Sequence, residues 1–393
     1  MIDVRTMRYD MKLDLLPFER MNQKKKTIEL RLNDEKRKEI KVGDLVFFHL
    51  LQDEYKVIKT KVIQVHHFPD FDTLYQSLPL EKCGYSKEEV PLAKSEDMLE
   101  YYSLQEQQKN GVLGIEVEKI DNDYLADCHM HLEYGPLSKD YVLEFVKEAL
   151  HKGLDEIDIL DHTHCFKEFK PCYEHLRIYP QQDKWLQQTT KFCNTLDEYL
   201  KLINEIKQMD LPIRIRFGLE VCYTRDTEDM LRQILDKHPF DFLTGAVHSF
   251  NHILYDMSFS KQLLWDRYPA DQIYQDYYEA LFDCVRSSLF DRLAHPDTIK
   301  LFQIYPAYDL KDTYRQLCLL LNEKKMYAEN NTGCHYRYNH PDIGLSDELL
   351  QMFIDHQVRV ICASDAHHPK DVGSYIREAL KRMKGESYGK QML

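Results

Sequence analysis

The hydrophobic and polar positions follow two different patterns along the chain, and the pattern changes near residue 120. Before that point, β-branched and aromatic residues gather in short runs, which is typical of strands. The predicted strands are residues 26–32, 45–50, 55–67 and 112–120, with a turn at 42–44 and helices at 71–78 and 95–109. We therefore predict a small β-barrel with one or two helices over residues 1–120.

Beyond a polar linker at residues 118–123, short apolar runs alternate with longer amphipathic segments. The apolar runs are residues 124–129, 156–162, 213–220, 241–248, 290–295, 325–331 and 358–364. The predicted helices between them are 139–152, 195–209, 228–237, 270–287, 310–323 and 347–356. Such alternation predicts an α/β domain over residues 121–393, built on a mostly parallel sheet or barrel.

Composition and charge narrow the class of protein. The 393 residues suggest two or three domains, and 43% hydrophobic with 30% charged residues is an ordinary globular composition. A net charge of −14 argues against a general nucleic-acid or membrane binder. The sequence has neither a signal-peptide core near its start nor an apolar run of about 20 residues. Ten cysteines without a C-x-x-C pair predict reduced thiols, so we expect a cytoplasmic protein with no membrane partner.

Each of the seven apolar runs ends on, or beside, residues that can bind a metal ion or a phosphate. These residues are His129 and His131; Asp161, His162 and His164; Glu220; His248; His295; Asn330 and Asn331; and Asp365 and His367. In parallel α/β folds the carboxyl ends of the strands meet at one face. We therefore expect these residues to converge on one pocket.

The residue types suit a metal centre. In the H-x-H pair His129 and His131, the period of two points both imidazoles the same way, although such a pair alone could be an exposed coincidence. Glu220 ends an apolar strand, where an acid is costly unless a cation pairs with it. Imidazole and carboxylate ligands without thiolates favour Zn²⁺, Mn²⁺ or Fe. The predicted ligands, enough for two or three ions, are His129, His131, His162, Glu220, His248, His295, Asp365 and His367. Clustered dications activate water and bind phosphoryl oxygens, which favours hydrolysis of phosphate esters.

Seven motifs in a fixed order resemble the PHP (polymerase and histidinol phosphatase) superfamily, histidinol-phosphatase branch, over residues 124–385. They are D-C-H-M-H (127–131), L-D-H-T-H (160–164), G-L-E (218–220), G-A-V-H (245–248), L-A-H-P-D (293–297), E-N-N-T-G (329–333) and S-D-A-H (364–367). The resemblance implies a distorted (β/α)7 barrel with a trinuclear metal centre.

By the same resemblance, each ion has its own ligands. The first would bind His129, His131, Glu220 and Asp365; the second, Glu220 and His248; the third, His162, His295 and His367. Family members place a further His, Asp or Glu shortly after H-x-H. Here that stretch reads L-E-Y-G-P-L-S, which leaves Glu133 as the candidate.

Catalytic and substrate-binding roles are predicted for several more residues. We predict catalytic roles for His164, His367 and Asp365; the leaving-group proton could come from a metal-bound water, from His164 or from His367. His164 could instead orient a ligand, contact substrate or be exposed. Phosphate calls for an arginine, and the candidate substrate contacts are Arg177, Arg337, Asn331 and Ser364, with a solvated surface role as the alternative for the arginines.

The first 120 residues resemble the ASCH domain, a small β-barrel related to PUA RNA-binding modules. The motifs are K-K-T-I-E-L-R (25–31), K-V-G-D (41–44) and G-V-L-G-I-E-V (111–117). Some ASCH proteins resemble amidohydrolases of modified nucleosides that use a Lys and a Thr. Lys26 matches that lysine, but Glu29 stands at the threonine position. Lys26, Glu29 and Arg31 are therefore candidates for binding a nucleobase or RNA, or else form a solvated pattern on an edge strand.

These observations predict a phosphomonoesterase that acts on a small phosphorylated metabolite by attack of a metal-bridging hydroxide on phosphorus. One alternative is a phosphodiesterase or nuclease on the same scaffold. Another is a nonenzymatic RNA-binding or regulatory protein with vestigial ligands. The sequence does not predict the oligomeric state.

Overall fold

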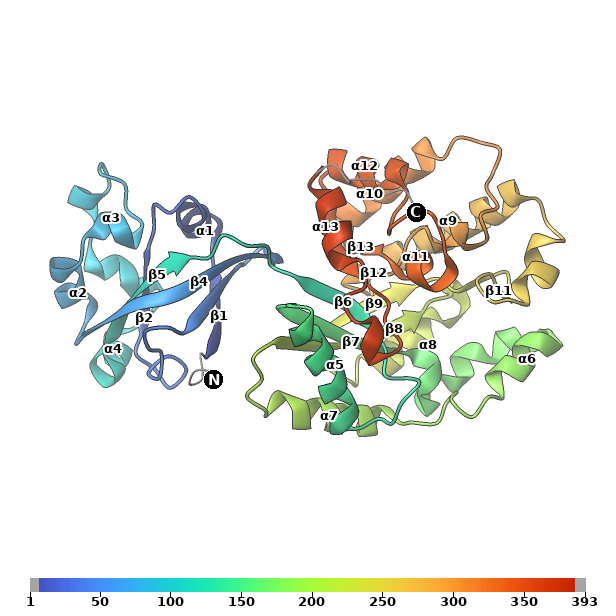
Figure 1. Cartoon of the computed structure of the whole chain (residues 1–393), viewed down its shortest axis with the longest axis horizontal. Coiled ribbons are helices and arrows are strands. Elements are labelled where there is room, and N and C mark those ends of the chain that lie inside the picture. Colours follow the sequence, from blue (N-terminus) through green and yellow to red (C-terminus); the bar gives the residue numbers. More distant parts are fainter. Residues whose placement is uncertain (1–6, 386–393) are drawn as a thin grey trace. The chain divides into compact units, whose positions relative to one another are not determined.

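The computed structural model describes residues 7–385, and the chain divides into two compact units with the boundary between Tyr124 and Leu125 (Figure 1). Within these residues, every helix is too short or too polar to cross a membrane. Each unit has its own hydrophobic core.

The first unit is a curled five-stranded sheet with short helices. Its strands are β1 (Arg8–Leu13), β2 (Ile28–Leu32), β3 (Leu45–Leu50), β4 (Asp53–Phe68) and β5 (Val112–Lys119). The order is β1-β3-β4-β5-β2, with β1 and β3 parallel and the other neighbours antiparallel. The helices are α1 (Leu15–Asn22), α2 (Phe71–Ser77), α3 (Leu80–Cys83) and α4 (Leu104–Asn110), with 3-10 turns at Val90–Leu92 and Ser95–Glu100.

Two differences from the predicted first unit have local causes. The predicted helix at 95–109 is interrupted because Ser103 caps a new helix: its hydroxyl accepts from the amide of Glu106, whose carboxylate accepts from the amide of Ser103. β1 and α1 were not predicted. β1 buries only Met11 and Leu13 and alternates them with charged residues, which makes a weak strand signal.

The second unit is a nearly closed barrel of seven parallel strands, which confirms the predicted fold class. The strands are β6 (Ala126–Met130), β7 (Glu156–His162), β8 (Arg214–Cys222), β9 (Phe242–Ala246), β12 (Arg292–Leu293), β13 (Tyr327–Asn331) and β14 (Arg359–Ala363). They are ordered β14-β13-β12-β9-β8-β7-β6. Segments after the last strand reach back to the first, because the amide of His131 donates to the carbonyl of Ala366 (2.8 Å) and that of Asp365 to the carbonyl of His129 (2.9 Å).

Helices surround this barrel (Figure 1). They are α5 (Lys139–His151), α6 (Pro180–Leu186), α7 (Leu196–Lys207), α8 (Glu228–Leu235), α9 (Ala270–Arg286), α10 (Lys311–Lys324), α11 (Gly333–Tyr338), α12 (Asp347–Asp355) and α13 (Ile376–Met383). α5 illustrates the packing: it buries Val142, Phe145, Val146 and Ala149, a spacing that places one face of a helix against the core. A small hairpin, β10 (Ser249–Phe250) and β11 (Ile253–Leu254), and 3-10 segments such as Lys167–Ile178 complete the loops.

Candidate metal centre

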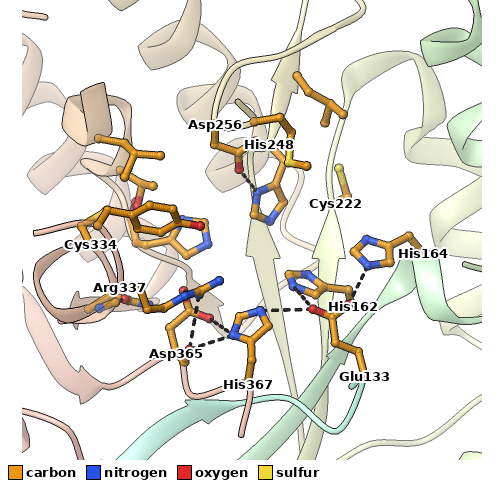
Figure 2. A pocket seen from close by; sticks show the side chains of 18 of the residues that line it. Glu133, His162, His164, Cys222, His248, Asp256, Cys334, Arg337, Asp365 and His367 are labelled. Atoms are coloured by element: carbon orange, nitrogen blue, oxygen red, sulfur yellow. Dashed lines mark hydrogen bonds and ion pairs between the residues drawn. The ribbon is translucent and has the colours of Figure 1, made fainter. Parts of the chain in front are cut away.

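The predicted ligands meet at the carboxyl ends of the barrel strands, and five of them line a cavity of about 190 Å³: His162, His248, His295, Asp365 and His367 (Figure 2). His129 lies in β6, His162 ends β7 and Glu220 lies near the end of β8. The remaining predicted ligands follow the ends of strands: His131, His248, His295, Asp365 and His367. Residues from six of the seven barrel strands, or from the segments that follow them, thus form one site, as the strand pattern predicted.

Glu220 is at the middle of this site and is contacted by five imidazoles. Its Oε1 lies 2.9 Å from Nε2 of His248 and 2.9 Å from Nε2 of His295. Its Oε2 lies 2.6 Å from Nδ1 of His162, and 3.4 and 3.5 Å from Nε2 of His129 and His131. Each oxygen of one buried carboxylate therefore faces its own group of nitrogens.

The electrostatics of these residues favour a positive charge among them. Burial would raise the pKa of Glu220, but the charges of His162, His129 and His248 lower it well below its ordinary value. Burial would lower the pKa of His129, but Glu329 and Glu220 raise it well above normal. A proton or a metal ion can supply the charge that these carboxylates stabilise.

The donor set fits metal ions better than protons. Three imidazole nitrogens lie within 3.5 Å of Oε2 of Glu220, yet none donates a well-directed hydrogen bond to it. The Nε2 atoms of His129 and His131 face each other at 2.9 Å. Lone pairs that converge in this way are arranged as the ligands of a cation are.

Asp365 joins this group from the other side. Its Oδ1 lies 3.1 Å from Nε2 of His131, and its Oδ2 lies 3.1 Å from Nη1 of Arg337. Burial would raise the pKa of Asp365, but the Arg337 charge and the His131 hydrogen bond lower it well below normal. The residue adopts a left-handed backbone conformation (φ 58°), which turns its side chain into the site.

A second group of ligand atoms forms around Glu133. Its Oε1 lies 3.2 Å from Nε2 of His367 and 3.9 Å from Nε2 of His162, and its Oε2 lies 3.0 Å from Nε2 of His164. Glu133, two residues after the H-x-H pair, therefore lies within 4 Å of three imidazoles.

His295 is grouped differently from the sequence-based assignment. It was placed with His162 and His367 at the third ion. Instead it shares Oε1 of Glu220 with His248, because β12 lies beside β9 in the barrel. His295 is therefore grouped with His248, and Glu133 with His164 and His367.

The predicted substrate contacts divide into two pairs. Asn331 and Arg337 line the cavity. Arg177 does not: it forms ion pairs with Glu174 (2.9 Å) and Asp183 (2.5 Å). Ser364 is fully buried behind the site, where its amide and hydroxyl donate to the carboxylate of Asp127, so its contacts fix the turn before Asp365.

Three residues of the site were missed by the sequence analysis. Oε1 of Glu329 lies 2.8 Å from Nδ1 of His129, and Oδ2 of Asp256 lies 2.8 Å from Nδ1 of His248. Such carboxylates fix the orientation of ligating imidazoles. Nζ of Lys191 lies 2.7 Å from Nε2 of His164. Glu329 is an acid in an apolar strand, the signal that identified Glu220, whereas Asp256 and Lys191 lie in loops without a pattern.

Two family models match this chain. The PHP domain model matches residues 127–333, and the ASCH domain model matches residues 12–121. The first of these matches covers more than half of the chain and contains most of the residues of the site.

Curated relatives match the second unit. A protein of Schizosaccharomyces pombe named "Probable histidinol-phosphatase" is 25% identical over 58% of this chain and 76% of its own length. A protein of the same name from Deinococcus radiodurans is 23% identical over 66% of this chain and 93% of its own length.

A solved structure supports the fold. The histidinol phosphate phosphatase of Lactococcus lactis, in complex with zinc, L-histidinol and phosphate, covers 67% of this chain and 94% of its own. The two chains are 20% identical and superpose with a TM-score of 0.50.

Proposed function

Because this chain belongs to the PHP domain family, we propose that it is a phosphomonoesterase whose substrate is a small phosphorylated metabolite. The chain is a metal-dependent phosphatase. The proposed substrate class rests on the cavity, which has a volume of about 190 Å³ and opens onto imidazoles that contact Glu220. A volume of this size suits a small metabolite.

The ions would be held by the groups described above. The first position has His129, His131 and Asp365, the second has His162, His248 and His295, and Glu220 lies between them. A third group of ligand atoms, on Glu133, His162, His164 and His367, lies beside them. Ions of zinc, manganese or iron suit these ligands. When bound, they would supply an activated water at neutral pH and neutralise charge on the phosphoryl group.

The protein's own residues bind and orient the substrate. Arg337 presents a guanidinium to the cavity beside Asp365, and a guanidinium pairs with phosphate oxygens through two parallel hydrogen bonds. Asn331 donates to Glu329 through Nδ2 and accepts from the amide of Gly333 through Oδ1, so its place at the cavity wall is fixed. Arg337 is therefore the residue we assign to the phosphate dianion.

The proposed acids are reassigned. Nδ1 of His367 lies 2.9 Å from the carbonyl oxygen of Asp365 and donates to it, and Nε2 lies 3.2 Å from Oε1 of Glu133, so both ring nitrogens are engaged within the protein. Burial and the charge of Lys191 lower the pKa of His164 to about 3, so His164 is neutral at pH 7. We therefore assign neither as the acid, and the leaving group takes its proton from solvent.

Comparison of monoesters with a diester tests this function. We expect kcat/KM for histidinol phosphate or an aryl phosphate to exceed that for the corresponding bis-aryl diester, with turnover lost after chelation and restored by Mn²⁺ or Zn²⁺. A diester turned over faster than both monoesters would identify a phosphodiesterase or nuclease instead.

A separate binding function is supported by a cavity of about 380 Å³ in the first unit. Lys26, Glu29 and Arg31 line it, together with the rings of Tyr85, Tyr101 and Tyr102. Glu29 is 2% exposed, with Oε2 3.3 Å from Nζ of Lys26 and Oε1 2.6 Å from Nη1 of Arg31. β2 is an edge strand, but Lys26 and Glu29 are buried rather than solvated.

We propose that this cavity binds a nucleobase, alone or within RNA, because tyrosine rings can stack on bases and the charged groups can bind their edges. Calorimetric titration of the full chain with nucleosides and short single-stranded RNAs tests it. Glu29→Gln should weaken binding at least tenfold, while the exposed Glu35→Gln should not. Absence of binding across the panel would reject this role.

A further inference from the structure

The metal centre contains an ammonium group of the protein itself. Nζ of Lys191 lies 2.7 Å from Nε2 of His164, 3.7 Å from Oε2 of Glu133 and 4.6 Å from the centre of the Trp185 ring. The side chain of Lys191 is only 5% exposed. An imidazole lone pair, a carboxylate and an aromatic face therefore surround the ammonium, and each of them stabilises a cation.

The backbone holds Lys191 in this position. The next residue, Phe192, adopts a left-handed conformation (φ 51°), and its amide donates to the carbonyl of His164 (2.7 Å). The amide of Asn194 donates to the carbonyl of Cys165 (3.1 Å), and that of Lys167 to the carbonyl of Asn194 (2.9 Å). The segment that carries Lys191 is thus hydrogen-bonded directly to the segment that carries His164.

The atoms that surround the ammonium are also ligand atoms of the third ion position. Ligand atoms of Glu133, His162 and His164 lie within 4.8 Å of one another. Nε2 of His164 has one lone pair, and while it accepts a hydrogen bond from Lys191 it cannot bind a metal ion. A dication at Glu133 would also lie close to a buried like charge, and such repulsion is strong where water is excluded.

We propose that Lys191 takes the place of a third cation, so that the centre holds two metal ions. This inference rests on the proposed metal-dependent function. Lys191 supplies the positive charge that Glu133 needs, while the first and second positions keep the ligands that surround Glu220. Glu133 then pairs with His367 and Lys191 rather than with an ion.

Metal stoichiometry tests the proposal without substrate. The full chain is loaded with Mn²⁺ by dialysis, freed of excess and measured by elemental analysis. We expect two ions per wild-type chain and three per Lys191→Met chain, with two in the matched Lys201→Met control on the exposed face of α7. Three ions in the wild type, or two in Lys191→Met, would overturn the proposal.

Glu133→Gln provides an independent measurement if Lys191→Met does not fold by circular dichroism. With Lys191 present, Glu133→Gln should leave the metal content at two ions per chain, because Glu133 is not a ligand of either ion. Loss of one ion in Glu133→Gln would show that an ion binds there and would reject the proposal. Because the count is made without substrate, absence of phosphatase activity would reject the proposed function and leave this result standing.

Discussion

Nδ1 of His129 lies 2.8 Å from Oε1 of Glu329, a residue 200 positions later in the chain. The other carboxylate oxygen, Oε2, accepts from the amide of His295 (3.2 Å) and from Nδ2 of Asn331 (3.1 Å). Glu329 therefore fixes the ring of His129 so that Nε2 faces Glu220. It contacts His129 of the first position and His295 of the second, and it does not line the cavity.

Glu329→Gln should weaken metal binding without removing a ligand. The side-chain amide of the glutamine would place its N–H hydrogens against donor groups that now bind the carboxylate of Glu329. The negative charge of Glu329 beside His129 would also be lost. We expect metal affinity to fall roughly tenfold to a hundredfold. Titration with Mn²⁺ measures it, and unchanged affinity would show that the orientation of His129 does not depend on Glu329.

Glu220→Gln should remove at least one ion, because it deletes the charge that five imidazoles surround. We expect kcat to fall roughly a thousandfold, equivalent to about 4 kcal/mol of transition-state stabilisation, with the fold retained. Elemental analysis, phosphatase rate and circular dichroism measure the outcome. The exposed Glu144→Gln on α5 is the control, and a full metal content with normal turnover in Glu220→Gln would make Glu220 structural.

Arg337→Ala should impair catalysis, whereas Arg177→Ala should not. Arg337 lines the cavity, and the loss of an arginine–phosphate pair should lower kcat/KM about a hundredfold, which corresponds to about 3 kcal/mol. Arg177 pairs with Glu174 and Asp183 away from the cavity and serves as the matched control. Equal effects of the two substitutions would contradict the assignment of Arg337 to phosphate.

The first unit should lose one source of stability in acid. Partial burial would raise the pKa of Asp10, but hydrogen bonds with His49 and Arg8 lower it well below normal. A carboxylate whose pKa is lower in the folded state than its unfolded value of about 4 stabilises the fold above that value. This contribution is lost as pH falls from the unfolded pKa towards the folded pKa.

We therefore expect Asp10→Asn to cost about 1 kcal/mol at pH 6, and the difference from wild type to shrink towards pH 3. Urea unfolding at several pH values measures it, with the exposed Glu100→Gln as control. A difference that stays constant with pH would mean that Asp10 acts by packing rather than by charge.

We also propose that the two units are separable. A fragment that starts at residue 121 should fold and bind metal, because all the ligand groups described lie in the second unit and domain boundaries fall where few contacts cross. Circular dichroism and elemental analysis of the fragment measure this. An insoluble or metal-free fragment would place the boundary elsewhere.

The sequence predicted the barrel well because its parallel strands are buried on both faces. Such strands appear as continuous apolar runs, and β7 was predicted with its observed bounds. The same runs identified Glu220, since an ionisable residue that ends an apolar strand is conspicuous. Glu329 was missed because it lies inside its apolar run, which ends on Asn330 and Asn331.

Contacts made by loops could not be predicted in this way. Asp256 and Lys191 reach the site through hydrogen bonds of irregular segments, and neither has a periodic neighbourhood that would single it out. The placement of His295 depended on which strands are neighbours in the barrel, which spacing along the chain does not determine. β1 was missed because charged residues alternate with its two buried ones.

The contact between Asp127 and Ser364 joins residues 237 positions apart, at the place where the first barrel strand meets the segment after the last. During synthesis on the ribosome, His129 and His131 leave the exit tunnel long before Asp365 does. His129 and His131 are therefore outside the ribosome before Asp365 has been synthesised, while the intervening strands emerge. A nascent chain interrupted before β14 has Glu220 and the imidazoles of the second position but lacks Asp365, so its first position is incomplete until Asp365 has been translated.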